Sequence, residues 1–265
     1  MPLTRDQNLR YARQILLPEV GGAGQEKLLA AHALVVGAGG LGSPVLLYLA
    51  ASGVGRITVV DDDTVAISNL QRQVLYDTVQ VGLGKASCAA ARIDALNPEV
   101  AVEVRTDRMT AANAAELVAK ADVVLDCVDT FGSRLTLSDA CVAAKKPLVS
   151  AAVQGFSGLL AVFDPASGGP CYRCLNPAPP TRDIRACEVA GILGAVAGWV
   201  GTAQALAAQR LILGLGDDRL GWLTTFDGLT GAARRVRLPR DPACPACGKH
   251  HTFAEGLGPS APPVP

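Results

Sequence analysis

The sequence predicts an α/β protein whose central sheet is mostly parallel and is covered by helices on both faces. Two observations lead to this prediction: apolar strands alternate with helices through short turns over residues 33–164, and a glycine-rich turn joins the first strand to the first helix of that series. We expect one domain over residues 1–255, which is ample length to bury a core, and a disordered tail over residues 256–265.

The apolar runs place the first strand at 33–36, a helix at about 41–52 and a second strand at 56–60. The second strand, RITVV, is apolar without alternation, as a parallel strand covered on both faces requires. A helix begins at about Lys85 and is stopped by Asn97-Pro98. Further strands are expected at 101–105, 121–129, 145–153, 158–164, 222–227 and 233–238.

Composition and charge narrow the functional classes. Basic and acidic residues number 24 each, so the net charge of zero gives no support to a nucleic-acid or polyanion binder. The start, MPLTRDQNLRYARQ, is charged throughout and lacks the apolar core of a signal peptide, which predicts a cytoplasmic protein. The uncharged stretch 189–209 has two interpretations, a membrane span and a buried helix. Its Thr202, Gln204 and Gln209 favour the buried helix.

The turn Gly37-Ala-Gly39-Gly40-Leu-Gly42 predicts a nucleotide site in a Rossmann-like fold. Glycines at these positions let backbone amides approach a phosphate at the positive end of the following helix. Asp61 ends the second strand, about twenty residues on, where a carboxylate accepts hydrogen bonds from ribose hydroxyls. These features alone do not separate NAD from ATP.

The segment beyond Asp61 favours ATP. Asn69, Arg72 and Gln73 lie in one loop, and Lys85 stands at a helix start, where the helix dipole disfavours a cation unless an anion lies between them. A solvated surface lysine is the alternative interpretation. An NAD site would leave these cations without a role, so they predict a polyphosphate ligand.

Two acids, Asp126 and Asp129, follow the predicted strand ADVVLDCVD. Carboxylates at the carboxyl end of a sheet strand that face a cluster of cations suit a magnesium ion on a polyphosphate. Together with the cations, they predict ATP with Mg²⁺.

Two pairs, Cys171-Tyr-Arg-Cys174 and Cys244-Pro-Ala-Cys247, predict a metal site. Four thiolates in two knuckles match a closed, tetrahedral, structural Zn²⁺ site with no open position for catalysis. The alternative, two redox dithiols, requires a cysteine at a helix start beside a βαβ unit, and neither pair has that context. His250 and His251 are expected to be bystanders. We therefore expect a C-terminal appendage stapled by zinc.

Cys187 has the most polar surroundings of the eight cysteines. It lies near Arg182 and Arg185, just before the apolar helix, and both cations and a helix N-terminus lower a thiol pKa. A reactive thiolate and an ordinary exposed cysteine both stay open as interpretations. The remaining cysteines lie in apolar segments and are expected to be inert core residues: Cys88, Cys127 and Cys141.

In this order the motifs resemble those of the HesA/MoeB/ThiF family, adenylyltransferases that activate ubiquitin-like sulfur carriers and are related to ubiquitin-activating enzymes. The likeness covers nearly the whole chain, through RYARQILLPEVGGAGQEKL, GAGGLGSP, DDDTVAISNLQRQ, GLGK, DCVDTFGSRLTLSDAC, GGPCYRCL, CEVAGILG and CPACG. It implies that the C-terminal Gly-Gly carboxylate of a carrier attacks the α-phosphate of ATP, giving an acyl-adenylate and pyrophosphate for molybdopterin- or thiamine-type sulfur transfer.

The resemblance also implies roles for individual residues. Asp61 would contact the ribose, Asp129 the magnesium ion, and Arg13 would reach into the partner subunit's site of a homodimer. The residues expected to act in the reaction are Arg13, Arg72, Lys85, Asp129 and Cys187. The residues expected to bind the nucleotide are Gly37, Gly39, Gly40, Gly42, Asp61, Ser68, Asn69, Leu70, Gln71, Arg72, Lys85, Asp129 and Thr130.

Two positions depart from the family pattern. Asp62 replaces a bulky apolar residue, and Thr130 stands where asparagine is frequent, which puts one nucleotide contact in doubt. No rhodanese-like segment follows the second cysteine pair, so we expect a separate protein to donate sulfur. Two other classes stay open: a non-catalytic module that binds a carrier or a nucleotide, and an NAD-dependent oxidoreductase.

Overall fold

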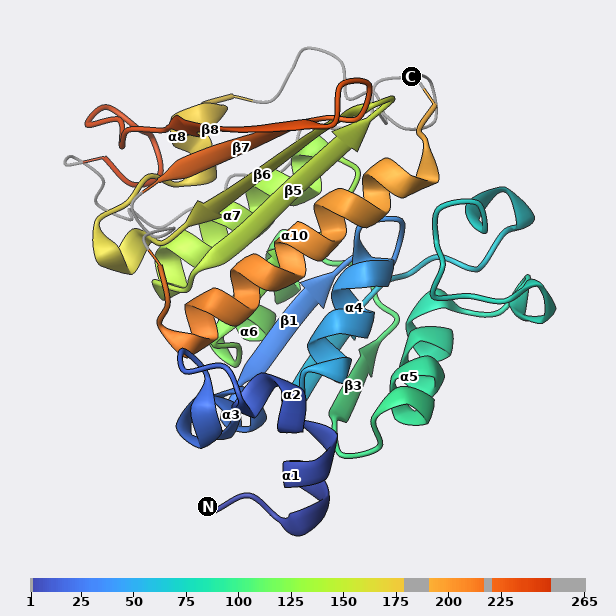
Figure 1. Cartoon of the computed structure of the whole chain (residues 1–265). Helices are drawn as coiled ribbons and strands as arrows, with labels where there is room; N and C mark the ends of the chain where they lie inside the picture. The colour runs from blue at the N-terminus through green and yellow to red at the C-terminus, as the bar shows by residue number, and fades with distance from the viewer. Residues whose placement is uncertain (1, 179–190, 217–220, 249–265) are drawn as a thin grey trace.

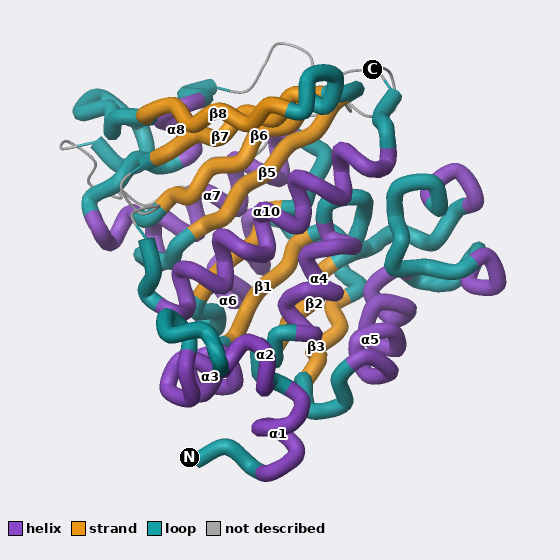
Figure 2. Tube along the Cα trace, in the orientation of Figure 1, coloured by secondary structure: helices purple, strands orange, loops and turns teal. Residues whose placement is uncertain are grey.

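Eight strands form one sheet in the order β3-β2-β1-β4-β5-β6-β7-β8, in a computed structural model that describes residues 2–178, 191–216 and 221–248. Strands β1 to β5 run parallel, and β6, β7 and β8 join them antiparallel. Figure 2 shows the strands in orange among the helices in purple. The strands are β1 (His32–Val36), β2 (Arg56–Val60), β3 (Ala101–Arg105), β4 (Val123–Asp126), β5 (Leu148–Gln154), β6 (Ser157–Phe163), β7 (Trp222–Asp227) and β8 (Ala232–Arg237).

Helices cover both faces of the sheet. Figure 1 shows α4, α5 and α10 on one face and α6 and α7 on the other. The α-helices are α1 (Arg5–Arg10), α2 (Ala12–Ile15), α3 (Gly21–Ala30), α4 (Gly42–Ala51), α5 (Lys85–Leu96), α6 (Ala111–Ala119), α7 (Phe131–Ala144), α8 (Tyr172–Leu175) and α10 (Gly194–Leu213). Short 3₁₀ turns are η1 (Ile67–Asn69), η2 (Thr78–Gln80) and η3 (Pro165–Ser167).

The predicted fold class, a mostly parallel sheet wound on both faces, is confirmed. The expected strands and the helices at 41–52 and from Lys85 lie within a few residues of their observed bounds. The largest difference is at β4, which is expected over 121–129 but ends at Asp126. The sequence patterns assigned no helix to α1–α3, α6 or α7.

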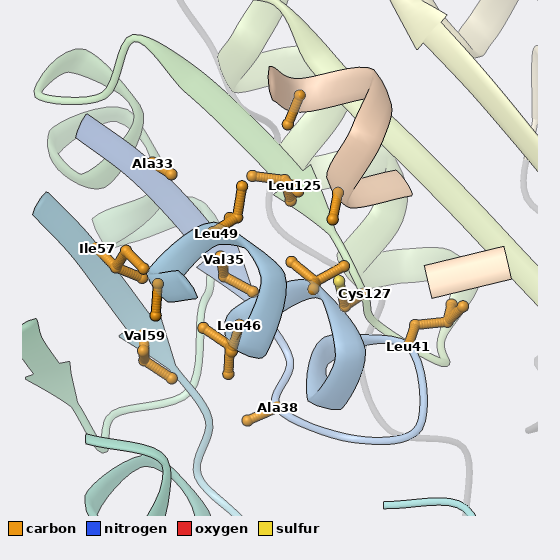
Figure 3. Packing of buried hydrophobic residues seen from close by; sticks show 14 of the residues in the cluster. Ala33, Val35, Ala38, Leu41, Leu46, Leu49, Ile57, Val59, Leu125 and Cys127 are labelled. Atoms are coloured by element: carbon orange, nitrogen blue, oxygen red, sulfur yellow. The ribbon is translucent and has the colours of Figure 1, made fainter. Parts of the chain in front are cut away.

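The side chains of β1 alternate between two apolar cores. Val35 points to the face covered by α4, where it meets Leu46 and Leu49 (Figure 3). Leu34 and Val36 point the other way, into a second core that includes residues of α6 and α7. Because both faces are buried, β1 and its neighbours β2 and β4 are mostly apolar without alternation.

Helix α10 lies across β5 and β6 and beside α4 (Figure 1). Its one fully buried amide, Gln204, donates from Nε2 to the carbonyl oxygens of Asp126 and Val149, both at 2.9 Å. These bonds satisfy a polar group in the core, and the prediction of a buried helix is confirmed for residues 194–213. None of the helices in the described residues is long and apolar enough to cross a membrane.

Candidate functional site

A cavity of about 590 Å³ lies beyond the carboxyl ends of the parallel strands. Its wall is built from the ends of β1, β2 and β4, the loops that follow them, and parts of β5 and β6. In an open α/β sheet this edge is the usual place for a ligand, because the connections of β1 and β4 leave it in opposite directions.

The phosphate turn between β1 and α4 has room only for glycine at two positions. Gly37 has φ +94°, and a Cβ atom there would lie 2.6 Å from the carbonyl oxygen of Cys127. A Cβ atom on Gly42 would lie 2.1 Å from the carbonyl oxygen of Gly37, so this glycine lets the helix pack against the turn. Gly39 and Gly40 face the cavity, and the turn therefore presents backbone to a ligand.

Asp61 ties the end of β2 to this turn. Its carboxylate accepts hydrogen bonds from the backbone amides of Ala38 (2.7 Å) and Asp63 (3.0 Å). Burial raises the pKa of Asp61, although these bonds and the charge of Lys85 oppose the rise. A carboxylate held in this way lines the cavity with lone pairs left to accept hydrogen bonds from hydroxyl groups.

Lys85 is a buried cation at the cavity wall. Its side chain is 6% exposed, and Nζ lies 2.9 Å from Oδ2 of Asp63, whose own side chain is 70% exposed. The backbone amide of Lys85 donates to the carbonyl oxygen of Asp63 at 2.9 Å, which fixes the two loops together. An almost buried ammonium paired with one exposed acid can exchange that partner for a phosphate.

The loop that contains η1 brings Asn69, Arg72 and Gln73 to the cavity. The side chain of Arg72 lies over Gly40, and its Nη1 donates to the carbonyl oxygen of Ser68 at 3.0 Å. Gln73 is 3% exposed, and its Oε1 has no hydrogen-bond partner among the described residues. Buried polar atoms without partners are rare, so this amide is suited to a ligand or its bound water.

The two acids after β4 have different environments. Asp126 is fully buried, and its carboxylate accepts from Ser150 Oγ at 2.6 Å and lies 3.1 Å from Arg134 Nη1. This carboxylate is already bound within the protein, so the expectation that Asp126 faces a magnesium ion is wrong. Asp129 is exposed at the cavity wall, and the neighbouring Thr130 caps α7 by accepting from the amide of Ser133 at 3.4 Å.

Several expected residues lie outside the cavity wall. Gly42 packs inside the turn, and Ser68, Leu70 and Gln71 support the loop without lining the cavity in the described part of the chain. Arg13 is exposed on α2, which lies near the amino ends of the strands, whereas the cavity lies at their carboxyl ends (Figure 1). Arg13 therefore cannot reach the cavity of its own chain.

The four paired cysteines come together as the sequence predicts. Their sulfur atoms all lie within 4.8 Å of one another, with Cys171 to Cys244 at 3.6 Å and Cys174 to Cys247 at 3.5 Å. A tetrahedral zinc site places its sulfur atoms about 3.8 Å apart. Burial raises the pKa of the Cys174 thiol to about 11, and a divalent cation would offset that cost by stabilising thiolates.

Cys187, Arg182, Arg185, His250 and His251 lie outside the described residues. The three cysteines expected in the core are buried, and burial raises the pKa of each thiol: Cys88, Cys127 and Cys141.

Sequence reasoning missed part of the cavity wall. Arg134 and Tyr172 line it, together with Leu175 and Asn176. Tyr172, Leu175 and Asn176 lie within or next to the first cysteine knuckle, so the segment that carries this knuckle forms part of the cavity. A tyrosine inside a Cys-x-x-Cys pair gives no signal of its own, because its position depends on how the knuckle folds back.

Comparison with known proteins places the chain among close relatives. The model described as "ThiF family" matches residues 11–246. The chain is 45% identical over 260 residues to the sulfur carrier protein adenylyltransferase of Thermus thermophilus, with 96% of each chain covered. It is 42% identical over 240 residues to the sulfur carrier protein ThiS adenylyltransferase of Escherichia coli, covering 91% of this chain and 95% of that protein.

Another relative is longer. The adenylyltransferase and sulfurtransferase MOCS3 of Mus musculus is 48% identical over 252 residues, which are 94% of this chain and 55% of that protein. Among solved structures, E. coli MccB superposes with a TM-score of 0.79 at 21% identity, over 96% of this chain and 76% of MccB. The complex of MccB with ATP gives a TM-score of 0.77 at 23% identity, over 90% of this chain and 74% of MccB. At this identity the likeness is one of fold.

Proposed function

The chain belongs to the ThiF family, and we propose that it uses ATP to adenylate the C-terminal Gly-Gly carboxylate of a sulfur carrier protein, releasing pyrophosphate. The observation that carries the proposal is the set of cations and acids at the cavity: Arg72 and Lys85 on one wall and Asp129 on another. Such a set suits a polyphosphate ligand, whereas an NAD-dependent oxidoreductase would leave these charged residues without a role.

The reaction is an in-line displacement at phosphorus. A carboxylate oxygen of the carrier forms a bond to the α-phosphorus as the bond to the bridging oxygen of pyrophosphate breaks, and no proton transfer is required. The protein therefore acts by placing charge: Arg72 and Lys85 stabilise the negative charge that spreads over the phosphoryl oxygens. Asp129 would hold the Mg²⁺ that accompanies ATP, which neutralises the leaving pyrophosphate.

We assign zinc to the four-cysteine cluster as a structural ion. Four sulfur donors, three of them buried, leave no open coordination position, so the ion would fasten the start of α8 at residues 171–174 to the loop at 244–247. Thr130, which stands where asparagine is frequent in the family, caps α7 with its hydroxyl group. The replacement of an amide by a hydroxyl removes no charge from the cavity.

The proposed assembly is a homodimer with composite sites. Leu9, Leu16 and Leu17 are exposed on the segment that holds Arg13, as is Tyr48 on α4, and a second copy would cover them. In that arrangement Arg13 of one subunit would enter the cavity of the other and add a third cation at the phosphates.

Exchange of labelled pyrophosphate into ATP tests the reaction. With a carrier ending in Gly-Gly, exchange is expected; with a carrier that lacks its last glycine, it should be absent. A non-catalytic module would bind both carriers and exchange with neither, and an NAD enzyme would instead show saturable NAD binding. Carriers of the molybdopterin and thiamine types assayed side by side identify the pathway.

Mixing inactive variants tests the dimer. Arg13→Ala and Lys85→Ala chains are each expected to be inactive, but a heterodimer has one site with both wild-type residues. With free exchange of subunits, about a quarter of all sites should recover. A mixture that stays inactive although subunits exchange would rule out the action of Arg13 in the partner's site.

A further inference from the structure

We propose that Tyr172, which lies between two metal-binding cysteines, acts through Arg134 to position the loop that carries Asp129. The proposal rests on the proposed function for the role of Asp129 in the nucleotide site. The contacts themselves are independent of that role. They form a short path from the cysteine cluster to the cavity.

The ring of Tyr172 is fixed by its surroundings. Tyr172 is 6% exposed, and its ring packs edge-on against Phe163 at 5.9 Å and at a tilt against Phe131 at 6.3 Å between centroids. It also lines the cavity.

Arg134 joins this ring to the loop after β4. Its guanidinium carbon lies 5.7 Å from the ring centroid of Tyr172. Nη1 donates to Ser150 Oγ at 3.0 Å and to the carbonyl oxygen of Ala151 at 2.8 Å, while Nη2 donates to the carbonyl oxygen of Val128 at 2.7 Å. Val128 directly precedes Asp129, so the orientation of the guanidinium sets the backbone from which that carboxylate projects.

The cysteine knuckle holds Tyr172 in place from the other side. Tyr172 is the first residue of α8, and Cys171 just before it and Cys174 within the helix both belong to the four-cysteine cluster. Arg173 then forms a two-pronged pair with Asp139 of α7, with both nitrogen–oxygen distances at 2.7 Å. The knuckle is therefore fastened to the same helix that begins directly after Thr130, and the Asp129 loop is held between β4 and a fixed helix.

A buried guanidinium depends on contacts on all its sides. Arg134 forms an ion pair with Asp126, with Nη1 3.1 Å from Oδ2. The Tyr172 ring lies against the guanidinium group, and such a cation–ring contact is stronger where water is excluded. If the ring is replaced by an aliphatic side chain, the guanidinium keeps its counterion but loses one of the contacts that fix its plane. The proposal requires that the hydrogen bond from Nη2 to the carbonyl oxygen of Val128 then weakens, since this bond is the contact with the loop.

Hydrogen–deuterium exchange of the nucleotide-free protein tests the positioning directly. Tyr172→Leu should speed amide exchange over residues 127–131 by about fivefold, whereas Tyr172→Phe, which keeps the ring, should not change it. Leu117→Ala is the matched control, because it removes a buried side chain from the same core on α6. It should lower the melting temperature without speeding exchange in that loop.

Calorimetric titration with ATP, with and without Mg²⁺, tests the consequence. Tyr172→Leu should reduce the gain in ATP affinity that Mg²⁺ gives by roughly tenfold, the size of a lost buried cation–ring contact, whereas Tyr172→Phe should keep that gain. Unchanged loop exchange in Tyr172→Leu with zinc still bound, or equal effects of Leu117→Ala, would overturn the proposal. If loop exchange rises as expected but wild-type protein shows no Mg²⁺-dependent affinity, the proposed function fails and the positioning contact stands.

Discussion

The two walls of the cavity are built in different ways. The wall at the phosphate turn comes from residues 36–85, a continuous segment in which each strand and its following loop contribute in chain order. The rest of the wall combines residues 127–134, 150–163 and 172–176 with Leu223, which come from separate strands and loops between β4 and β7 and from the first cysteine pair. A site made by one segment is visible in a sequence as a motif, and a site made by folding is not.

This difference explains how much the sequence could predict. The parallel strands, the glycine turn, Asp61 and the position of Lys85 all follow from local pattern, and the structure places them at one edge of the sheet. Helix α7 gave no helical signal because its buried face includes Arg134 and Ser138, which weaken the apolar period. The distinction between Asp126 and Asp129 depends on that same arginine, which no strand pattern identifies as a core residue.

The largest effect is expected at the wall made by one segment. Lys85→Ala should lower the rate of ATP–pyrophosphate exchange by about a thousandfold, because under the proposed function it removes a preorganised cation at the transferring phosphoryl group. The fold should survive, since the lost partner, Asp63, is exposed to water. Lys120→Ala, at the residue that caps α6, breaks only a surface pair with Glu116 and should keep full exchange. Comparable loss in both variants would contradict a role specific to Lys85.

The two acids should respond in opposite ways. Asp129→Asn should lower exchange by about a hundredfold with an unchanged melting temperature, because it alters an exposed cavity residue. Asp126→Asn should lower the free energy of unfolding by about 3 kcal/mol, because it leaves the buried Arg134 without its counterion. Urea denaturation and the exchange assay on both variants measure this. If Asp126→Asn were stable and inactive while Asp129→Asn were normal, the assignment of the two acids would be reversed.

The wall made by folding should depend on metal. Wild-type protein purified without chelator is expected to hold about one zinc ion per chain, and Cys247→Ser should lose it, with a fall of about 10 °C in melting temperature. Cys88→Ala, at a buried cysteine outside the cluster, should keep the zinc. Elemental analysis and thermal melts check both. If wild-type protein purified in this way held no zinc, the assignment of the four cysteines to a zinc site would be wrong.

The smallest expected effects come from two glycines that differ only in their surroundings. A Cβ atom on Gly42 would lie 2.1 Å from the carbonyl oxygen of Gly37, and backbone at that distance cannot yield without moving the phosphate turn. Gly198, in the interior of α10, has nothing within 4 Å of its Cβ position. Gly42→Ala should therefore cost about 2–3 kcal/mol of stability, as overpacking does, and weaken ATP binding.

Gly198→Ala should instead stabilise the protein by about 0.5–1 kcal/mol, because alanine loses less backbone entropy in a helix. Urea denaturation measures the free energy of unfolding of both variants. It therefore distinguishes a steric clash at Gly42 from the effect of helix propensity at Gly198. Equal behaviour of the two variants would mean that the turn shifts to accommodate a side chain. In that case the phosphate wall would be adaptable, and the close approach of Gly42 to Gly37 would not be what holds its shape.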